Sequence, residues 1–287
     1  PDRIKEGYGP NAPAMRALAG KGAKLVLTLD CGTTSFEPLA EARDAGLDVI
    51  IVDHHEPEPA LPPVFAVVNP NRLDEDGAYG QLCTAGLAFV LAVGLNRELR
   101  ARGHWTTERP EPDLTQWLDM AALGTVCDVV PLTGLNRAIV TQGLKVMARR
   151  DNIGLTALAD VASMREQPAA YHLGFILGPR INAGGRIGQS DLGVRLLTTE
   201  DAGEAAALAT RLDILNAERQ EIERAVLDDA LNRIASRGEP GAVVVTAGDG
   251  WHPGVVGIVA SRLVEKFGRP ACVVAVDGGR GTGSGRS

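Results

Sequence analysis

The chain has 287 residues, with 29 Lys and Arg against 36 Asp and Glu and a formal net charge of −7. This length can bury a sizeable core and favours two domains. The acidic balance disfavours nucleic-acid binding over the whole surface, because phosphates attract basic surfaces, but it leaves room for a local basic groove. No apolar stretch reaches the roughly 18 residues of a membrane span, and residues 1–6 carry no apolar signal. We therefore expect a cytoplasmic protein with no membrane partner.

Two predicted strands end in side chains that can bind metals. The strands and the residues that follow them are 25–29 with Asp30, and 49–52 with Asp53, His54 and His55. A helix is predicted between them over residues 35–44, with Gly46 at its C-terminal end, which gives a βαβ unit. Because such a crossover makes the strands parallel, both carboxyl ends lie at one edge of the sheet, where ligands bind in open α/β folds.

Further elements are predicted in chain order. They are a short strand at 64–68, a helix at 84–100 built on Leu87, Val90, Leu91 and Leu95, a helix at 114–126 that ends before Asp128, a long helix at 199–238 capped by Thr198 or Thr199, strands at 242–246 and 271–276 around a helix at 255–267, and a glycine-rich loop at 278–287. The fold class is therefore α/β, with a parallel-sheet domain joined by a long helix to a smaller α/β domain.

Asp30, His54, His55 and Asp128 are the candidate metal ligands. A lone aspartate at a strand end is more often a cap or turn residue, so Asp30 alone indicates little. Asp-His-His directly after a buried strand has little structural purpose, and oxygen with imidazole donors suits Mn²⁺ or Mg²⁺. The four cysteines lack the close pairing of a zinc site. We expect the two beside the aspartates, at positions 31 and 127, to be small buried apolar residues.

Five segments resemble successive signatures of the DHH phosphoesterases. They are residues 28–32, 52–55, 124–132, 178–186 and 250–257. Within that family the segments are most similar to those of the bacterial RecJ single-stranded-DNA exonucleases. The resemblance implies a DHH domain over 1–198, a connecting helix over 199–238 and a smaller DHHA1 domain over 239–287, with a catalytic cleft between the domains.

The resemblance also implies a role for each candidate ligand. Asp30 would bridge two divalent ions, Mn²⁺ or Mg²⁺, while His54 and Asp128 would hold one of them. His55 would stand beside the ion or the scissile phosphate, and Asp53 would orient the histidines by hydrogen bonding. Two ions would activate a water for in-line attack on phosphorus. The implied reaction is 5′-to-3′ hydrolysis of single-stranded DNA in repair and recombination.

A further set of residues is implied to bind DNA phosphates. They are Arg3, Arg180, Asn182, Arg186, His252, Gly283, Ser284, Gly285 and Arg286. Guanidinium groups grip phosphate oxygens in bidentate fashion, and glycine lets backbone amides approach closely. Base stacking on Tyr8, Trp251 or Phe267 is a weaker hypothesis, because each of these residues suits a core or a cleft wall. We expect a monomer whose partners are single-stranded DNA and other DNA-repair proteins.

One departure concerns the start of the family pattern. That pattern begins with Asp-x-Asp-Gly after the first strand, and this chain begins downstream of the segment. Asp74-Glu75-Asp76-Gly77 is similar but follows a turn rather than a strand, so we predict a solvated loop there. We expect a fragment that also lacks the C-terminal OB-fold domain of the relatives. By itself it should show little nuclease activity, even in millimolar Mn²⁺.

Two alternatives to the exonuclease stay open. The first is a DHH phosphoesterase that acts on short oligoribonucleotides, cyclic dinucleotides or pyrophosphate. The acidic net charge of the chain conflicts less with these small substrates than with a long nucleic acid. The second is a non-catalytic DNA-binding scaffold of replication. The presence of Asp30, His54, His55 and Asp128 argues against a scaffold, because a scaffold has no physical need to gather these side chains.

Overall fold

The computed structural model describes residue 7 and residues 9–287. Its chain divides into two compact units, the first made of residues 1–179 with 196–206, and the second of residues 180–195 with 207–287. The domain boundaries expected from the family resemblance stay a prediction. Arg3 and Tyr8 lie outside the described residues.

The first unit contains a parallel sheet. Its strands, in the order β1-β2-β3, are β1 (Leu25–Leu29), β2 (Asp48–Val52) and β3 (Ala66–Val68). Leu29 pairs with Val52, and Val52 pairs with Val68, so the three strands end side by side. Helix α2 (Phe36–Asp44) connects the first two strands. The predicted βαβ unit and its parallel sheet are confirmed.

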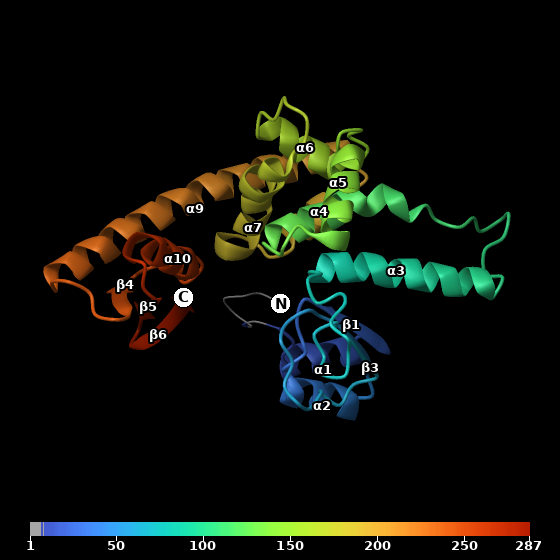
Figure 1. Cartoon of the computed structure of the whole chain (residues 1–287), viewed down its shortest axis with the longest axis horizontal. Coiled ribbons are helices and arrows are strands. Elements are labelled where there is room, and N and C mark those ends of the chain that lie inside the picture. The colour runs from blue at the N-terminus through green and yellow to red at the C-terminus, as the bar shows by residue number, and fades with distance from the viewer. Residues whose placement is uncertain (1–6, 8) are drawn as a thin grey trace. The chain divides into compact units, whose positions relative to one another are not determined.

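Helix α2 ends as its glycine predicts. Gly46 takes a φ of 78°, a left-handed conformation that disfavours side chains, and its N–H donates to Arg43 O at 2.9 Å. Helix α1 (Ala12–Gly20), which the sequence analysis did not predict, packs beside α2 in the blue part of Figure 1. The buried residues around these helices are Met15, Leu39, Ala42, Leu47, Val49 and Ile51.

Helices follow the sheet in the first unit. They are α3 (Thr84–Ala101), a 3-10 turn (Leu114–Trp117), α4 (Leu118–Cys127), α5 (Gly134–Met147), α6 (Ile153–Val161) and the π-helix η2 (His172–Leu177). Helices α3 and α4 match predicted helices. Val90 and Leu95, however, are 39% and 57% exposed, so two of the four predicted core positions of α3 are wrong. Its covered face is narrower than the apolar pattern indicates.

The chain passes from one unit to the other within three helices, which are α7 (Gly178–Ile187), α8 (Leu192–Thr198) and α9 (Ala202–Ser236). Helix α9 is the long helix predicted from the sequence, drawn in orange in Figure 1. Its cap differs from the prediction, because Asp201 Oδ1 accepts from Glu204 N–H at 2.7 Å while Thr199 Oγ1 accepts from Asp201 N–H at 3.2 Å. The aspartate thus supplies the cap and the threonine supports it.

The second unit is built on a second sheet. Strand β4 (Val244–Asp249) pairs in parallel with β5 (Ala271–Asp277), and β6 (Arg280–Arg286) pairs with β5 in antiparallel fashion. Helix α10 (Val256–Phe267) packs on the sheet and is drawn in red in Figure 1. The prediction of a loop at the glycine-rich end is therefore wrong for residues 280–286. Pairing with β5 outweighs the low strand preference of glycine.

Among the helices of the described part, none has the length and apolar composition that a bilayer crossing requires.

Candidate metal centre

The strand ends deliver the candidate ligands to one edge of the first sheet. Asp30 follows β1, and its N–H donates to Val52 O at 3.0 Å. Asp53 follows β2, and its N–H donates to Val68 O at 3.1 Å. These bonds continue the ladders one residue beyond each strand. Asp30 then leaves the strand direction with a φ of 65°, a left-handed conformation that aspartate tolerates better than most residues.

A single imidazole nitrogen lies between two carboxylates. His54 Nε2 is 3.4 Å from Asp30 Oδ1 and 3.4 Å from Asp128 Oδ2. Asp128 reaches this position because it caps the C-terminus of α4, where its N–H donates to Gly124 O at 2.9 Å. His55 joins the group, because donor atoms of Asp30, His54 and His55 all lie within 4.8 Å of one another. The structure thus gathers side chains from positions 30, 54, 55 and 128.

The cluster is open on its carboxylate side. The side chain of His54 is 16% exposed, whereas those of Asp30 and Asp128 are 57% and 33% exposed. Burial raises the pKa of Asp128, and the neighbouring carboxylate of Asp30 adds to the rise while His54 opposes it. The carboxylates of Asp30 and Asp128 repel each other across the imidazole of His54 and are open to solvent. A divalent cation would fit this site, because it would relieve that repulsion.

Asp53 is the buried anchor of the histidine pair. It is 1% exposed and accepts from His54 N–H at 2.9 Å and from His55 N–H at 3.3 Å. Burial opposes its ionisation, yet hydrogen bonds from His55 and Thr33 outweigh burial and lower the pKa of Asp53. The ionised carboxylate therefore fixes the backbone of both histidines.

The side chain of His55 is held by the same carboxylate. His55 Nδ1 lies 2.6 Å from Asp53 Oδ1. A neutral imidazole that donates from Nδ1 keeps Nε2 as an acceptor for a metal or a proton. Burial lowers the pKa of His55, but the bond to Asp53 raises it by more, so the net change is upward.

Two asparagines that follow β3 hold the main chain of the histidines by hydrogen bonds, and sequence reasoning missed both of them. Asn69 Nδ2 donates to His55 O at 2.8 Å, and Asn71 Nδ2 donates to His54 O at 2.5 Å. Asn69 is 3% exposed, and its Oδ1 accepts from Asn71 N–H at 2.8 Å. The predicted strand ends at residue 68, and the asparagines after it have no predicted role. Their position after a third parallel strand was the available signal, because that strand ends at the same edge.

The cysteine beside Asp128 stays out of the cluster. Cys127 Sγ lies 3.5 Å from Leu173 O, and burial raises the pKa of Cys127 to about 11, with a further rise from Asp128. A thiol that stays protonated is a poor zinc ligand. Among the described residues, the cluster that could hold a metal contains no cysteine.

The predicted phosphate ligands of the second unit lie near the start of α10. Arg186 Nη1 donates to Gly254 O at 3.3 Å, and Gly254 N–H donates to His252 Nδ1 at 3.0 Å. Arg286 Nη1 donates to Ser284 Oγ at 2.9 Å. Burial lowers the pKa of His252, which favours the neutral ring.

Ser284 and Arg286 approach the first turn of α10. A Cβ at Gly257 would lie 3.1 Å from Ser284 Oγ and 3.2 Å from Arg286 Nη2, so glycine gives these side chains their space. Gly283 and Gly285 belong to β6, opposite Val274 and Cys272 of β5. Their backbones are therefore committed to a strand rather than to a free loop.

Two further candidates lie on α7. Arg180 Nε donates to Asp213 Oδ1 at 2.8 Å, so its charge is already paired within the second unit. Asn182 is exposed on the same helix.

The segment that resembles Asp-x-Asp-Gly is an exposed loop, as predicted. Asp74 Oδ1 accepts from Arg72 Nε at 2.9 Å, and Asp76 Oδ1 accepts from Ala78 N–H at 2.9 Å. Both carboxylates serve the turn itself and take no part in the metal cluster of the described residues.

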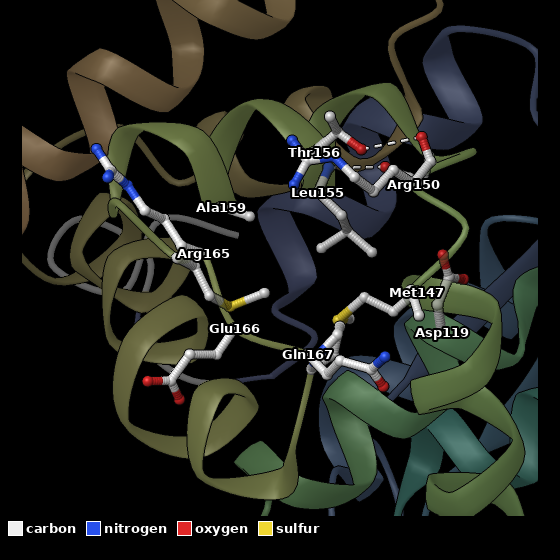
Figure 2. A pocket seen from close by; sticks show the side chains of 13 residues that line it. Asp119, Met147, Arg150, Leu155, Thr156, Ala159, Arg165, Glu166 and Gln167 are labelled. Carbon is white, nitrogen blue, oxygen red and sulfur yellow. Dashed lines mark hydrogen bonds between the residues drawn. The ribbon is translucent and has the colours of Figure 1, made fainter.

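A cavity of about 230 Å³ lies elsewhere in the first unit. Figure 2 shows its wall, which includes Asp119, Met147, Arg150, Leu155 and Gln167. None of the candidate metal ligands lines it, so the open carboxylate cluster, rather than this cavity, is the candidate site.

Comparisons with known proteins agree with the motifs. Residues 1–125 match the model of the DHH family, N-terminal domain. The chain is 42% identical over 290 residues to the single-stranded-DNA-specific exonuclease RecJ of Bacillus subtilis, covering 99% of this chain and 35% of that protein. It is 41% identical over 297 residues to the RecJ of Escherichia coli, covering 100% of this chain and 51% of that protein. The chain thus spans a third to a half of these relatives.

Solved structures give the same result. A crystal structure of exonuclease RecJ bound to manganese superposes with a TM-score of 0.81 at 37% identity, covering 96% of this chain and 66% of that one. The structure of RecJ from Thermus thermophilus in complex with Mn²⁺ superposes with a TM-score of 0.76 at 37% identity, covering 91% of this chain and 38% of that one. The predicted fold class is confirmed, and so is the predicted similarity to the DHH family, whose N-terminal-domain model matches residues 1–125.

Proposed function

We propose that this chain acts in a metal-dependent exonuclease that hydrolyses single-stranded DNA from its 5′ end, in DNA repair and recombination. The observation that carries the proposal is the position of His54 Nε2, 3.4 Å from a carboxylate oxygen of Asp30 and of Asp128. The similarity to RecJ exonucleases, over nearly the whole chain, supports the choice of substrate.

The donor set fits hard divalent cations. Carboxylate oxygens and imidazole nitrogen, without a thiol, suit Mn²⁺ or Mg²⁺. Relatives have been solved with each of these ions. Asp30, His54, His55 and Asp128 would hold the metal, which would supply an activated water and neutralise charge on the phosphate.

The protein's own groups prepare that site. Asp30 and Asp128 present negative charge at the open side of the cluster, and His54 fixes the gap between them. Asp53, buried behind the histidines, holds the His55 ring so that its Nε2 can accept a proton or bind at the cluster. Preorganised donors of this kind need little rearrangement during the reaction.

The second unit would grip the nucleic-acid backbone. Arg186, His252, Ser284 and Arg286 lie around the start of α10, where a helix N-terminus adds a partial positive charge. Arginine forks bind phosphate oxygens in pairs. Arg186 and Arg286 would supply the local positive charge that an acidic net charge leaves possible.

The test is product analysis with the complete protein in Mn²⁺. Labelled single strands and labelled dinucleotides are compared, with Asp30→Ala as the inactive control. Release of mononucleotides from the 5′ end of the long strand, abolished by Asp30→Ala, is the expected result. Faster turnover of the dinucleotide would favour a small-substrate phosphoesterase. Single-strand binding without metal-dependent hydrolysis would favour a scaffold.

A further inference from the structure

Two aromatic rings stack on each other at the surface of the first unit. Tyr171 and Phe175 have ring centroids 5.3 Å apart and an interplanar angle of 24°. They are nevertheless 61% and 70% exposed. Single exposed apolar residues are common, but adjacent large rings left in water usually mark a binding surface.

The π-helix η2, which carries Phe175 and directly follows Tyr171, packs against the end of α4. Leu173 and Leu177 of η2 are fully buried, and Leu173 O accepts from Cys127 Sγ at 3.5 Å. A Cβ at Gly174 would lie 3.3 Å from a methyl group of Val126. This part of η2 therefore rests on the last residues of α4, directly before Asp128. The aromatic stack and one candidate ligand share the same support.

The helix type adds to the argument. Residues 172–177 form a π-helix, which is rare and costs stability relative to an α-helix, and such segments occur frequently at functional sites. The buried leucines hold one side of it, while the tyrosine and phenylalanine rings are left exposed. The sequence offers no folding reason for placing both rings in water.

We propose that the stacked rings of Tyr171 and Phe175 are a platform on which bases of the single-stranded substrate stack. This proposal rests on the proposed function and adds a base-binding site to it. Every base has an apolar π-face, so stacking on aromatic side chains holds a single strand without reading its sequence. A duplex hides these faces, so the platform selects for single strands.

Two of the residues named from the sequence as candidates for base stacking, Trp251 and Phe267, are packed in the second unit. Trp251 is 7% exposed and donates from Nε1 to Asp229 Oδ2 at 2.8 Å, and Phe267 packs against the core of the second unit. Trp251 is therefore a core residue, and Phe267 is half-buried at the edge of that core. Both rings are less exposed than those of Tyr171 and Phe175.

The test is binding of fluorescent oligonucleotides to the complete protein in EDTA, so that no strand is cut. One oligonucleotide is normal, and a second has the same backbone with abasic positions. Phe175→Leu and Tyr171→Leu keep an apolar side chain but remove the ring face. Each should weaken binding of the normal strand by roughly 5- to 100-fold per lost stacking contact and leave the abasic strand unchanged.

Controls separate stacking from folding and from function. Phe65→Leu removes another exposed ring, 72% exposed and placed before β3, at the opposite edge from the ligands, and should change neither affinity. Tyr171→Phe should keep wild-type binding. Thermal unfolding checks that the leucine variants are folded.

A second measurement covers a leucine variant that fails to fold. Phe175→Trp places an indole on the platform, and its emission should be quenched by the normal strand and much less by the abasic strand, after subtraction of the wild-type signal. Unchanged affinity in both leucine variants, or equal weakening on both strands, would overturn the proposal. Hydrolysis of the long strand in Mn²⁺ is measured in parallel, so failure of the proposed function is seen separately.

Discussion

Asn69 donates its side-chain amide to the main-chain carbonyl of His55 at 2.8 Å, from a position directly after β3. Asn71 makes the matching bond to His54 O. Asp53 accepts hydrogen bonds from the main-chain N–H groups of both histidines. The main chain of each histidine is therefore held at its N–H group and at its carbonyl group. Groups behind metal ligands fix the geometry that the ion requires.

Removal of these bonds should weaken metal binding. We expect Asn69→Ala to lower the affinity for Mn²⁺ by about 10- to 100-fold, the usual loss when a group that orients metal ligands is removed. Calorimetric titration of Mn²⁺ measures it. Asn152→Ala is the matched control, because it removes the N-terminal cap of α6 in the same unit and should cost stability without changing metal affinity. Equal Mn²⁺ affinity in Asn69→Ala and wild type would contradict the account.

Asp30→Asn should separate activity from stability. Asparagine also tolerates the left-handed φ of 65° at this position, so the fold should persist. Loss of the carboxylate charge should reduce turnover by more than about 100-fold. This loss should be larger than the loss expected when a group that only orients a metal ligand is removed. Rates of mononucleotide release and unfolding temperatures give the two readouts. Asp74→Asn, in the exposed loop, should leave both unchanged, and a comparable loss there would contradict the loop assignment.

Arg286→Ala should act on binding rather than on turnover. The guanidinium of Arg286 lies beside Ser284 at the start of α10. Its removal should weaken single-strand binding. It should also reduce the slope of log affinity against log salt concentration by about one, the value expected for a single phosphate contact. Binding titrations at several salt concentrations measure this. Arg262→Ala, which removes an arginine paired with Glu265 in the same unit, is the control. An unchanged slope in Arg286→Ala would contradict a phosphate contact.

Asp119 predicts a pH-dependent effect on stability. It is 2% exposed, and burial raises its pKa more than the hydrogen bond from Met120 N–H lowers it. A raised pKa means that the folded chain holds the proton more tightly than the unfolded chain. The contribution of this group to stability is therefore full below its ordinary pKa and is lost as pH rises through the raised value.

Asp119→Asn should accordingly be more stable than wild type at pH 7. The amide keeps the oxygen that accepts from Met120 N–H at 2.7 Å but cannot ionise. The difference should narrow as pH falls toward about 4, the ordinary pKa of aspartate. Urea unfolding across this range measures it. Asp113→Asn should show the opposite sign, because hydrogen bonds from Thr115 lower the pKa of Asp113. The same sign in both variants would contradict this explanation.

The parts of the site that local pattern determines were predictable. An apolar strand followed by Asp-His-His, and a helix followed by Asp128, place their side chains by position alone once the strands are known to be parallel. The roles of Asn69 and Asn71 were not predictable in this way. They depend on hydrogen bonds to His54 and His55, which follow the neighbouring strand, and asparagine beside proline is equally typical of a simple turn.

Two features of the fold show the same limit. Residues 280–286 alternate glycine with other residues, a composition that favours a loop, and they become β6 only because β5 offers an edge. The π-helix that carries Phe175 and directly follows Tyr171 has no periodic signal of its own. Its form depends on packing of Leu173 and Leu177, and the exposure of its rings appears only in three dimensions.

The most direct test is anomalous diffraction at the manganese edge from crystals soaked in Mn²⁺. We expect a manganese peak within bonding distance of His54 Nε2 and of carboxylate oxygens of Asp30 and Asp128, and we expect this peak to be lost in a His54→Ala crystal. Manganese peaks only at other locations, at concentrations that support hydrolysis, would show that these side chains do not form the metal centre.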